Sequence, residues 1–513
     1  MDPVIRNRQE AVDAVEAYSP AEQQFNLRRK TVGLLVAPLL FLIVLALPMA
    51  SLTPQAHRLA AIIVLVVVLW ITEGIPLAVT ALVGPLLAIL LQVASAPKAL
   101  SSFADPIIFL FIGSFILAES MYVHGLDRRI AYTALSSRLI GRSAARLLVT
   151  FGAISVVISM WISNTATAAM MFPIGMSIVT HLSRQGMGQA PQFRRFATTM
   201  MLITAFGASL GGMATPIGTP PNLIGIGMVR ELLGVQISFF RWMALGLPLA
   251  IGLYAVLAIG FWLVGARGLR LPDATAKLVR RELSQLGPMS RGERNVMAAF
   301  FTTVLLWTLP GLLALVGQRE SWFARTYQAS MPEAAAALTG AILLFVLPVD
   351  WRQRRFTMSW AEAVRIDWGT VLLFGGGLTM GSLAFSTGLA EAMGRSVATW
   401  MPSHSPLAFT ALFTGFAIVL SEMTSNTASA SMVVPVAIAV CEAAGVRAIE
   451  PALGATLGAS VGFMLPISTP PNAIAYSSGH VPISAMMKHG VALDVVSFVL
   501  IVIVVSIMGP LLF

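Results

Sequence analysis

The chain reads ISNTATAA at residues 162–169 and TSNTASAS at residues 424–431, and each motif lies in the middle of a long apolar run. In a straight membrane-spanning helix, these serine, asparagine and threonine side chains would meet lipid, where an unpaired polar group is costly. The two runs, about residues 148–180 and 405–440, are therefore predicted to be re-entrant hairpins. Each hairpin turns at its Ser-Asn-Thr motif, where protein or a water-filled cavity surrounds it.

A second pair of motifs contains consecutive prolines, as PIGTPPN at residues 216–222 and PISTPPN at residues 466–472. Two adjacent prolines remove backbone donors and open a helix. The surrounding apolar runs, 197–228 and 451–485, are therefore predicted to be broken helices whose freed carbonyl groups can bind a cation. A packed kink is the simpler interpretation of one proline, but two matched Pro-Pro-Asn sequences favour an open break.

These motifs belong to an internal repeat. Asp367 and Asn426 lie 262 positions after Asp105 and Asn164, and Asn472 lies 250 positions after Asn222. With the N-terminus placed in the cytoplasm, most of the 33 Lys and Arg residues fall in cytoplasmic segments, and the two copies run in opposite directions. An inverted repeat is typical of secondary transporters, which bind their substrate where the copies meet. The predicted organisation is a cytoplasmic segment 1–30, a first repeat 31–266, a cytoplasmic linker 267–294 and a second repeat 295–513.

Composition supports a helical membrane protein. Of 513 residues, 57% are hydrophobic and only 11% are charged, which excludes an ordinary soluble domain. The net charge of +10 comes from short loops, so no nucleic-acid partner is expected. We predict an all-α polytopic fold with about 11 transmembrane helices besides the two hairpins. The predicted spans are 31–50, 56–72, 76–94, 106–124, 197–228, 242–266, 295–316, 331–349, 368–390, 451–485 and 490–512.

The Ser-Asn-Thr turns offer two kinds of chemistry. Their hydroxyl and amide oxygens can ligate a hard cation, and their hydrogens can donate to a carboxylate. The helix that starts after each turn presents free N–H groups to an anion. Helix capping is the simpler explanation for one such motif, whereas two copies in inverted repeats favour a ligand site. Neither turn contains Lys or Arg, so an anion would depend on helix ends, hydroxyls, amides and bound cations for charge compensation.

The sequence contains other candidate sites. Glu422 lies in the second hairpin and could orient the site, but no acid occurs inside the four motifs, so a proton relay has no obvious carrier. The strings at 207–211 and 458–462 match the hydrolase Gly-x-Ser-x-Gly pattern. Because they lie in apolar helices without catalytic partners, close helix packing is the better explanation, and no enzyme activity is expected. Cys441 is expected to be a small buried hydrophobe.

The four motifs, with TEGIPL at 72–77 and DWGTVLLFGGG at 367–377, resemble the divalent anion/sodium symporter family. The resemblance covers nearly the whole chain after residue 30. It implies import of C4-dicarboxylates such as succinate, fumarate and malate, coupled to sodium, across the inner (plasma) membrane. It further implies a homodimer with scaffold and transport domains that move as an elevator, and no organic cofactor. A sodium-independent dicarboxylate exchanger and a sodium-coupled sulfate or citrate transporter remain open alternatives.

The resemblance also implies site residues, since the family's motif positions are matched here. One sodium ion would be held by the first hairpin and the first helix break, and a second by their counterparts. The implied sodium ligands are Ser159, Ser163, Asn164 and the Gly218 carbonyl in one site, and Ser421, Ser425, Asn426 and the Ser468 carbonyl in the other. The implied substrate contacts are Asn164, Thr165 and Thr219 from one repeat, and Asn426, Thr427, Thr469 and Pro470 from the other.

Overall fold

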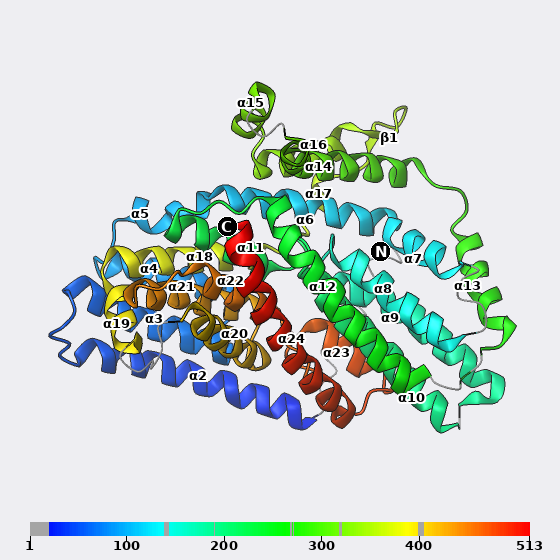
Figure 1. Cartoon of the computed structure of the whole chain (residues 1–513), viewed down its shortest axis with the longest axis horizontal. Helices are drawn as coiled ribbons and strands as arrows, with labels where there is room; N and C mark the ends of the chain where they lie inside the picture. The colour runs from blue at the N-terminus through cyan, green and yellow to red at the C-terminus, as the bar shows by residue number, and fades with distance from the viewer. Residues whose placement is uncertain are drawn as a thin grey trace.

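The structure is a computed structural model, and it describes residues 20–137, 143–188, 190–266, 269, 271–317, 321–398 and 405–513. Nearly all of this part of the chain is helical (Figure 1). Ten of the described helices are long and apolar enough to cross a membrane, or eleven if the bent pair α15 and α16 forms one span. The prediction of an all-α membrane protein with about 11 spans is confirmed. Large apolar side chains, including Leu35, Leu315 and Leu511, lie exposed on its outer surface, as contact with lipid requires.

The first half of the chain runs from α2 to α12. Its helices are α2 (Pro20–Ala46), α3 (Pro54–Thr72), α4 (Leu77–Leu90), α5 (Ala96–Leu100), η1 (Ser101–Ala104), α6 (Pro106–His124), α7 (Leu126–Leu135), α8 (Ala144–Ser159), α9 (Asn164–Leu182), η2 (Ser183–Met187), α10 (Pro191–Gly212), α11 (Pro220–Leu233) and α12 (Phe239–Phe261), which η3 (Trp262–Ala266) continues.

The second half follows the linker helix. Its elements are α13 (Asp273–Gln285), α14 (Arg291–Leu315), α15 (Trp322–Ser330), α16 (Glu333–Val346), β1 (Pro348–Asp350), β2 (Arg355–Phe356), α17 (Trp360–Ala363), α18 (Trp368–Ser386), α19 (Leu389–Ala398), α20 (Pro406–Met423), α21 (Asn426–Ala443), α22 (Ile449–Gly458), α23 (Pro470–Ser477) and α24 (Ile483–Leu512).

Three local features differ from expectation. Helix α2 begins at Pro20, so the predicted leader 1–30 contributes its last residues to the first long helix, while residues 1–19 lie outside the described chain. The spans predicted at 76–94 and 331–349 contain helices of only 14 residues each.

A small antiparallel hairpin, β1 with β2, follows α16, because the Asp350 carboxylate accepts the N–H groups of Arg352 and Gln353 and turns the chain. The linker 267–294 contains α13 and the start of α14.

Both Ser-Asn-Thr motifs lie at a tight turn between two helices. Helix α8 ends at Ser159 and α9 begins at Asn164, and likewise α20 ends at Met423 and α21 begins at Asn426. Both Thr-Pro-Pro-Asn motifs begin a new helix after a break, as α10 ends at Gly212 before α11 and α22 ends at Gly458 before α23. The four irregular points therefore fall where the sequence predicted them.

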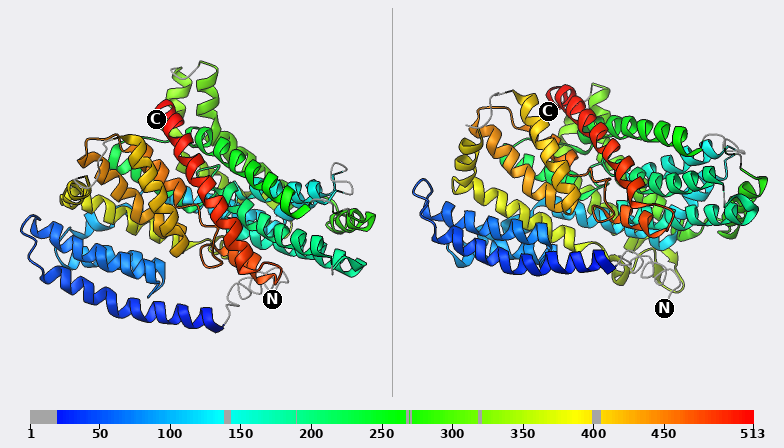
Figure 2. Two further views of the ribbon diagram at one scale, coloured as in Figure 1. Left: turned by 60° about the horizontal axis from the view of Figure 1, so that its bottom comes forward. Right: turned by 90° about the horizontal axis from the view of Figure 1, so that it is seen from below.

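The two repeats exchange partners. The hairpin helix α9 packs against α23 from the second repeat, and its counterpart α21 packs against α11 from the first. In the same way, α6 of the first repeat packs against α16 of the second, and α18 of the second repeat packs against α4 of the first. Helix α24 runs diagonally between α20 and α22 on one side and α12 on the other, and it contacts all three (Figures 1 and 2). The motifs of both repeats are therefore built into one interlocked core.

Glycines explain how closely the hairpins approach the broken helices. A Cβ atom at Gly211 would lie 2.2 Å from the Val156 carbonyl oxygen on α8, and one at Gly458 would lie 2.7 Å from the Thr414 carbonyl oxygen on α20. Real Cβ atoms do not approach so closely, so only glycine allows these backbone contacts. The small-residue strings at 207–211 and 458–462 therefore serve helix packing, as predicted.

Candidate functional site

The first hairpin turn is held by a hydrogen bond between two of its predicted sodium ligands. The Ser159 hydroxyl donates to Asn164 Oδ1 at 2.8 Å, which joins the last residue of α8 to the first residue of α9. Ser163 caps α9, since its hydroxyl accepts the Ala166 N–H at 3.2 Å. Ser163 and Thr165 are exposed at the turn. The hydrogen bond thus fixes the orientation of the Asn164 side chain, while the neighbouring side chains of Ser163 and Thr165 are exposed to solvent.

The second turn repeats this arrangement. The Ser421 hydroxyl lies 2.7 Å from Asn426 Oδ1 and 2.8 Å from the Ala459 carbonyl oxygen, which belongs to the following helix break. Ser425 precedes α21 at the capping position, but its hydroxyl forms no capping bond. Ser425, Asn426 and Thr427 are half-buried, so this turn is more enclosed than the first. The Ser-to-Asn hydrogen bond is the feature that both repeats share.

Each helix break is fixed by the asparagine that ends its Thr-Pro-Pro-Asn motif. The Asn222 amide donates to the carbonyl oxygens of Gly212 and Thr215, at 2.8 and 2.7 Å. The Asn472 amide donates to those of Gly462 and Leu465, both at 3.0 Å. Both asparagines are fully buried, and each side chain satisfies carbonyl groups that the broken helix frees. The same side chain therefore shapes the same loop in both copies.

The first turn and the first break meet at Gly212. A Cβ atom at Gly212 would lie 2.4 Å from Asn164 Oδ1, and one at Gly218 would lie 2.6 Å from the Gly212 carbonyl oxygen. Ser159, Asn164 and Gly218, three of the four predicted sodium ligands of this repeat, therefore gather around one glycine. In the second repeat, a Cβ atom at Gly462 would lie 3.5 Å from the Ser421 hydroxyl oxygen and from Ser468 Cβ.

The predicted substrate contacts lie at four helix starts. Thr219 and Thr469 are buried at the starts of α11 and α23, and the Thr469 hydroxyl accepts the Asn472 N–H at 3.4 Å. Pro470 is exposed. Because α9 packs against α23 and α21 against α11, each hairpin helix lies alongside a helix of the other repeat. The structure brings these helices of the two repeats together.

One acid proves more closely tied to the site than the sequence indicated. Glu422 Oε2 accepts the Ser468 hydroxyl at 2.5 Å, and its Oε1 accepts the Met464 N–H at 2.8 Å. The first repeat has no counterpart, because Met160 and Gly218 stand at the matching positions. A second acid, Asp494, was missed, although a lone carboxyl group inside the apolar run 490–512 was a visible signal.

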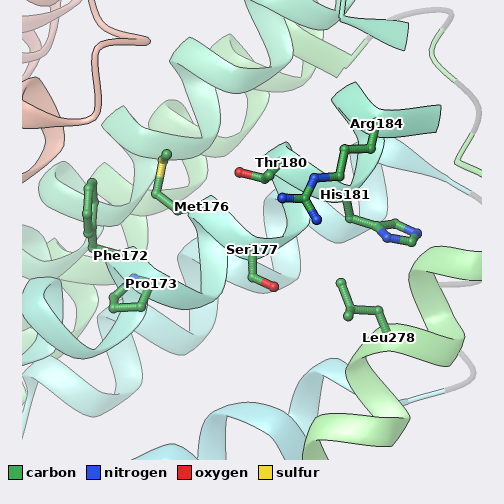
Figure 3. A pocket seen from close by; sticks show the side chains of 8 residues that line it. All are labelled: Phe172, Pro173, Met176, Ser177, Thr180, His181, Arg184 and Leu278. Carbon is green, nitrogen blue, oxygen red and sulfur yellow. The ribbon is translucent and has the colours of Figure 1, made fainter. Parts of the chain in front are cut away.

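A surface cavity lies elsewhere on the first hairpin. It has a volume of about 560 Å³ and lies along the C-terminal half of α9, next to Leu278 of α13 (Figure 3). Arg184 and His181 give it a basic rim, while Phe172 and Met176 line its apolar end. None of the predicted site residues lines it. The cavity is therefore separate from the turn at Asn164.

Known proteins resemble this chain along nearly its whole length. The family model described as the sodium:sulfate symporter transmembrane region matches residues 28–513. The sodium-dependent dicarboxylate transporter SdcS of Staphylococcus saprophyticus is 31% identical over 484 residues, which cover 93% of this chain and 91% of that protein. SdcS of Staphylococcus aureus is 32% identical over 489 residues, which cover 94% and 91%.

Two solved structures share the fold at low sequence identity. The YdaH transporter of Alcanivorax borkumensis superposes with a TM-score of 0.52 and 12% identity, over 95% of this chain and 98% of its own. MtrF of Neisseria gonorrhoeae superposes with a TM-score of 0.53 and 13% identity, over 88% and 94%. At such identities the similarity concerns the fold alone.

Proposed function

Because this chain belongs to the sodium:sulfate symporter family, we propose that it imports C4-dicarboxylates such as succinate, fumarate or malate together with sodium. One observation of the structure carries the proposal, namely the matched hydrogen bonds from Ser159 to Asn164 and from Ser421 to Asn426. The relatives named sodium-dependent dicarboxylate transporters support the same substrate and cation. The cell inner membrane is the proposed location, with the N-terminus in the cytoplasm.

Each sodium ion is proposed to bind between a hairpin turn and a helix break. Sodium is a hard cation that prefers oxygen ligands, and both places supply carbonyl, amide and hydroxyl oxygens. In the first repeat, Asn164 Oδ1 already lies against Gly212, beside Gly218. In the second, Ser421 and Ser468 lie on either side of Gly462. The proposed ligands of both sites are the residues that were predicted from the sequence.

The dianion is proposed to bind between the two turns, with one carboxylate at each Asn-Thr pair. Helices α9 and α21 start at these pairs, and their free N–H groups favour negative charge. The motifs contain no basic side chain, so two bound sodium ions supply the remaining compensation. Sodium binding would therefore complete the anion site, and substrate would in turn tighten sodium binding.

Transport requires the site to face each side of the membrane in turn. We assign the hairpins and broken helices to a moving transport domain and α6, α16, α4 and α18 to a scaffold, in a homodimer that works as an elevator. The glycines of α18 support this division, because a Cβ atom at Gly377 would lie only 3.0 Å from Ser431 on α21, and one at Gly381 would lie 3.3 Å from Pro435. A smooth helix face suits a sliding contact.

Uptake of labelled succinate into proteoliposomes tests the function. An inward sodium gradient should drive accumulation above equilibrium, whereas an equal gradient of choline should not. Uptake that depends on internal succinate alone, whether or not sodium is present, would contradict this proposal. It would indicate a sodium-independent dicarboxylate exchanger. Uptake of sulfate or citrate in place of succinate, still driven by sodium, would keep the mechanism and change the cargo.

A further inference from the structure

The surface cavity beside α9 has a polar end and an apolar end (Figure 3). Phe172 and Met176 lie in the part of α9 nearer to the Asn164 turn, and Thr180 and Arg184 lie near its other end. Phe172 and Thr180 are eight residues apart, which places the two ends about 12 Å from each other along the helix. The volume of about 560 Å³ is typical of cavities that bind small organic molecules. The cavity can therefore hold an elongated ligand with one polar and one apolar end.

The polar end offers hydrogen-bond donors that the protein itself does not use. Within the described chain, the exposed Arg184 side chain forms no ion pair and no hydrogen bond. The exposed hydroxyl groups of Ser177 and Thr180 likewise have no partner among the described residues. These three side chains are three or four positions apart, so they share one face of the helix. Together they suit an anion with several oxygen atoms, such as a phosphate group.

The surroundings of the cavity are basic. No acid is among the described residues that line it. Its far wall is formed by Leu278 of α13, and the same helix exposes Lys277, Arg280 and Arg281 close to Leu278 in the sequence. One acid, the half-buried Glu282, follows them. Since exposed basic side chains near a membrane attract anionic groups, the charge of this region favours a negative ligand.

The polarity of the cavity also follows that of a lipid bilayer. Helix α9 belongs to a candidate membrane span, Asn164–Met187, and it starts at a hairpin turn that is predicted to lie inside the membrane. The apolar end therefore lies deeper, and Arg184 lies nearer to the membrane surface, where lipid phosphate groups are found. A small dicarboxylate would leave Phe172 and Met176 without a partner, whereas a phospholipid matches both ends.

We propose that the cavity binds one anionic phospholipid, with its phosphate group at Arg184 and Thr180 and the start of one acyl chain against Met176. Because the cavity lies between α9 and α13, the lipid contacts both the first hairpin and the linker that joins the two repeats. It stabilises this arrangement of the two helices. The inference goes beyond sodium-coupled import and does not depend on it, since the lipid is bound and not transported.

Titration of the purified full-length protein in detergent with dioleoyl phosphatidylglycerol, followed by native mass spectrometry, tests this site. The wild type should bind one saturable lipid per chain at the cavity. Arg184→Gln should weaken this binding roughly tenfold, because it removes charge-assisted hydrogen bonds to the phosphate. Met176→Gln should also weaken it, since the acyl chain would meet an unpaired amide. Arg365→Gln is the matched control, because Arg365 is exposed beside the start of α18 and does not line the cavity.

Two competitors separate the lipid from other ligands. Dioleoyl phosphatidylcholine has the same chains without net charge, and glycerophosphoglycerol has the same head group without chains, so each should compete weakly. Competition by glycerophosphoglycerol as strong as that by the lipid would overturn the assignment in favour of a free anion. Equal binding of the two lipids, or equal effects of Arg184→Gln and Arg365→Gln, would also overturn it. Absence of sodium-driven succinate uptake would contradict the proposed function and leave this binding result standing.

Discussion

Replacing Asn164 or Asn426 by alanine is expected to lower sodium-driven succinate uptake by roughly tenfold to a hundredfold. Each change removes the amide oxygen that Ser159 or Ser421 holds in place at the turn. A hydrogen bond or ligand to a charged group contributes about 1.5–3 kcal/mol, which corresponds to that loss. Initial uptake rates in proteoliposomes at several sodium concentrations measure the effect.

Replacing the serines that orient these amides should have a smaller effect in the same uptake measurement. Ser159→Ala and Ser421→Ala should raise the sodium concentration for half-maximal uptake while leaving the maximal rate closer to wild type. Ser155→Ala is a matched control, because Ser155 lies one turn earlier on α8 and bonds only to the Phe151 carbonyl of its own helix. A wild-type sodium dependence in both asparagine variants would remove the hairpin turns from the cation sites.

Competition between anions should show a strong preference for two carboxylates. In the proposed arrangement, with one carboxylate at each Asn-Thr pair, succinate, fumarate or malate would satisfy both sets of donors, whereas acetate or lactate would leave one set unpaired. Buried donors left unpaired cost about 1–3 kcal/mol each, so monocarboxylates should bind roughly tenfold more weakly or worse. Inhibition of labelled succinate uptake by a panel of anions at fixed sodium measures the difference.

Sulfate is the informative member of that panel. It carries two charges on one compact group, so in the proposed arrangement it cannot reach both turns as a four-carbon dicarboxylate would. Inhibition by sulfate stronger than that by succinate would contradict the paired-carboxylate geometry and favour the sulfate alternative. Equal inhibition by monocarboxylates would show that only one Asn-Thr pair contacts the substrate.

The irregular points of this fold were predictable because each has a local chemical cause. Polar residues in an apolar run require a turn, and adjacent prolines require a break, so the ends of α8, α10, α20 and α22 follow from the sequence. The repeat offset also predicted that Asn222 and Asn472 have equivalent positions. The structure shows that they donate to equivalent carbonyl groups.

Other features depend on contacts between segments that are far apart in the sequence, so no local sequence pattern predicts them. The exchange of partners, with α9 against α23 and α21 against α11, follows from how the two repeats interlock. The β1–β2 hairpin is too short for an alternating pattern to reveal it. Asp494 is buried in α24, and the close packing of this helix at Gly490 against Phe463 of the second break had no signal in the local sequence.

Sodium is proposed to complete the anion site, and calorimetric titration of succinate into the purified protein measures this coupling. Titrations are compared in sodium chloride and in choline chloride at equal ionic strength. Sodium should lower the dissociation constant of succinate by about fivefold or more, which is the lower end of the effect that coupled ligands usually have on each other's affinity. The same dissociation constant in both salts would show that sodium does not complete the anion site.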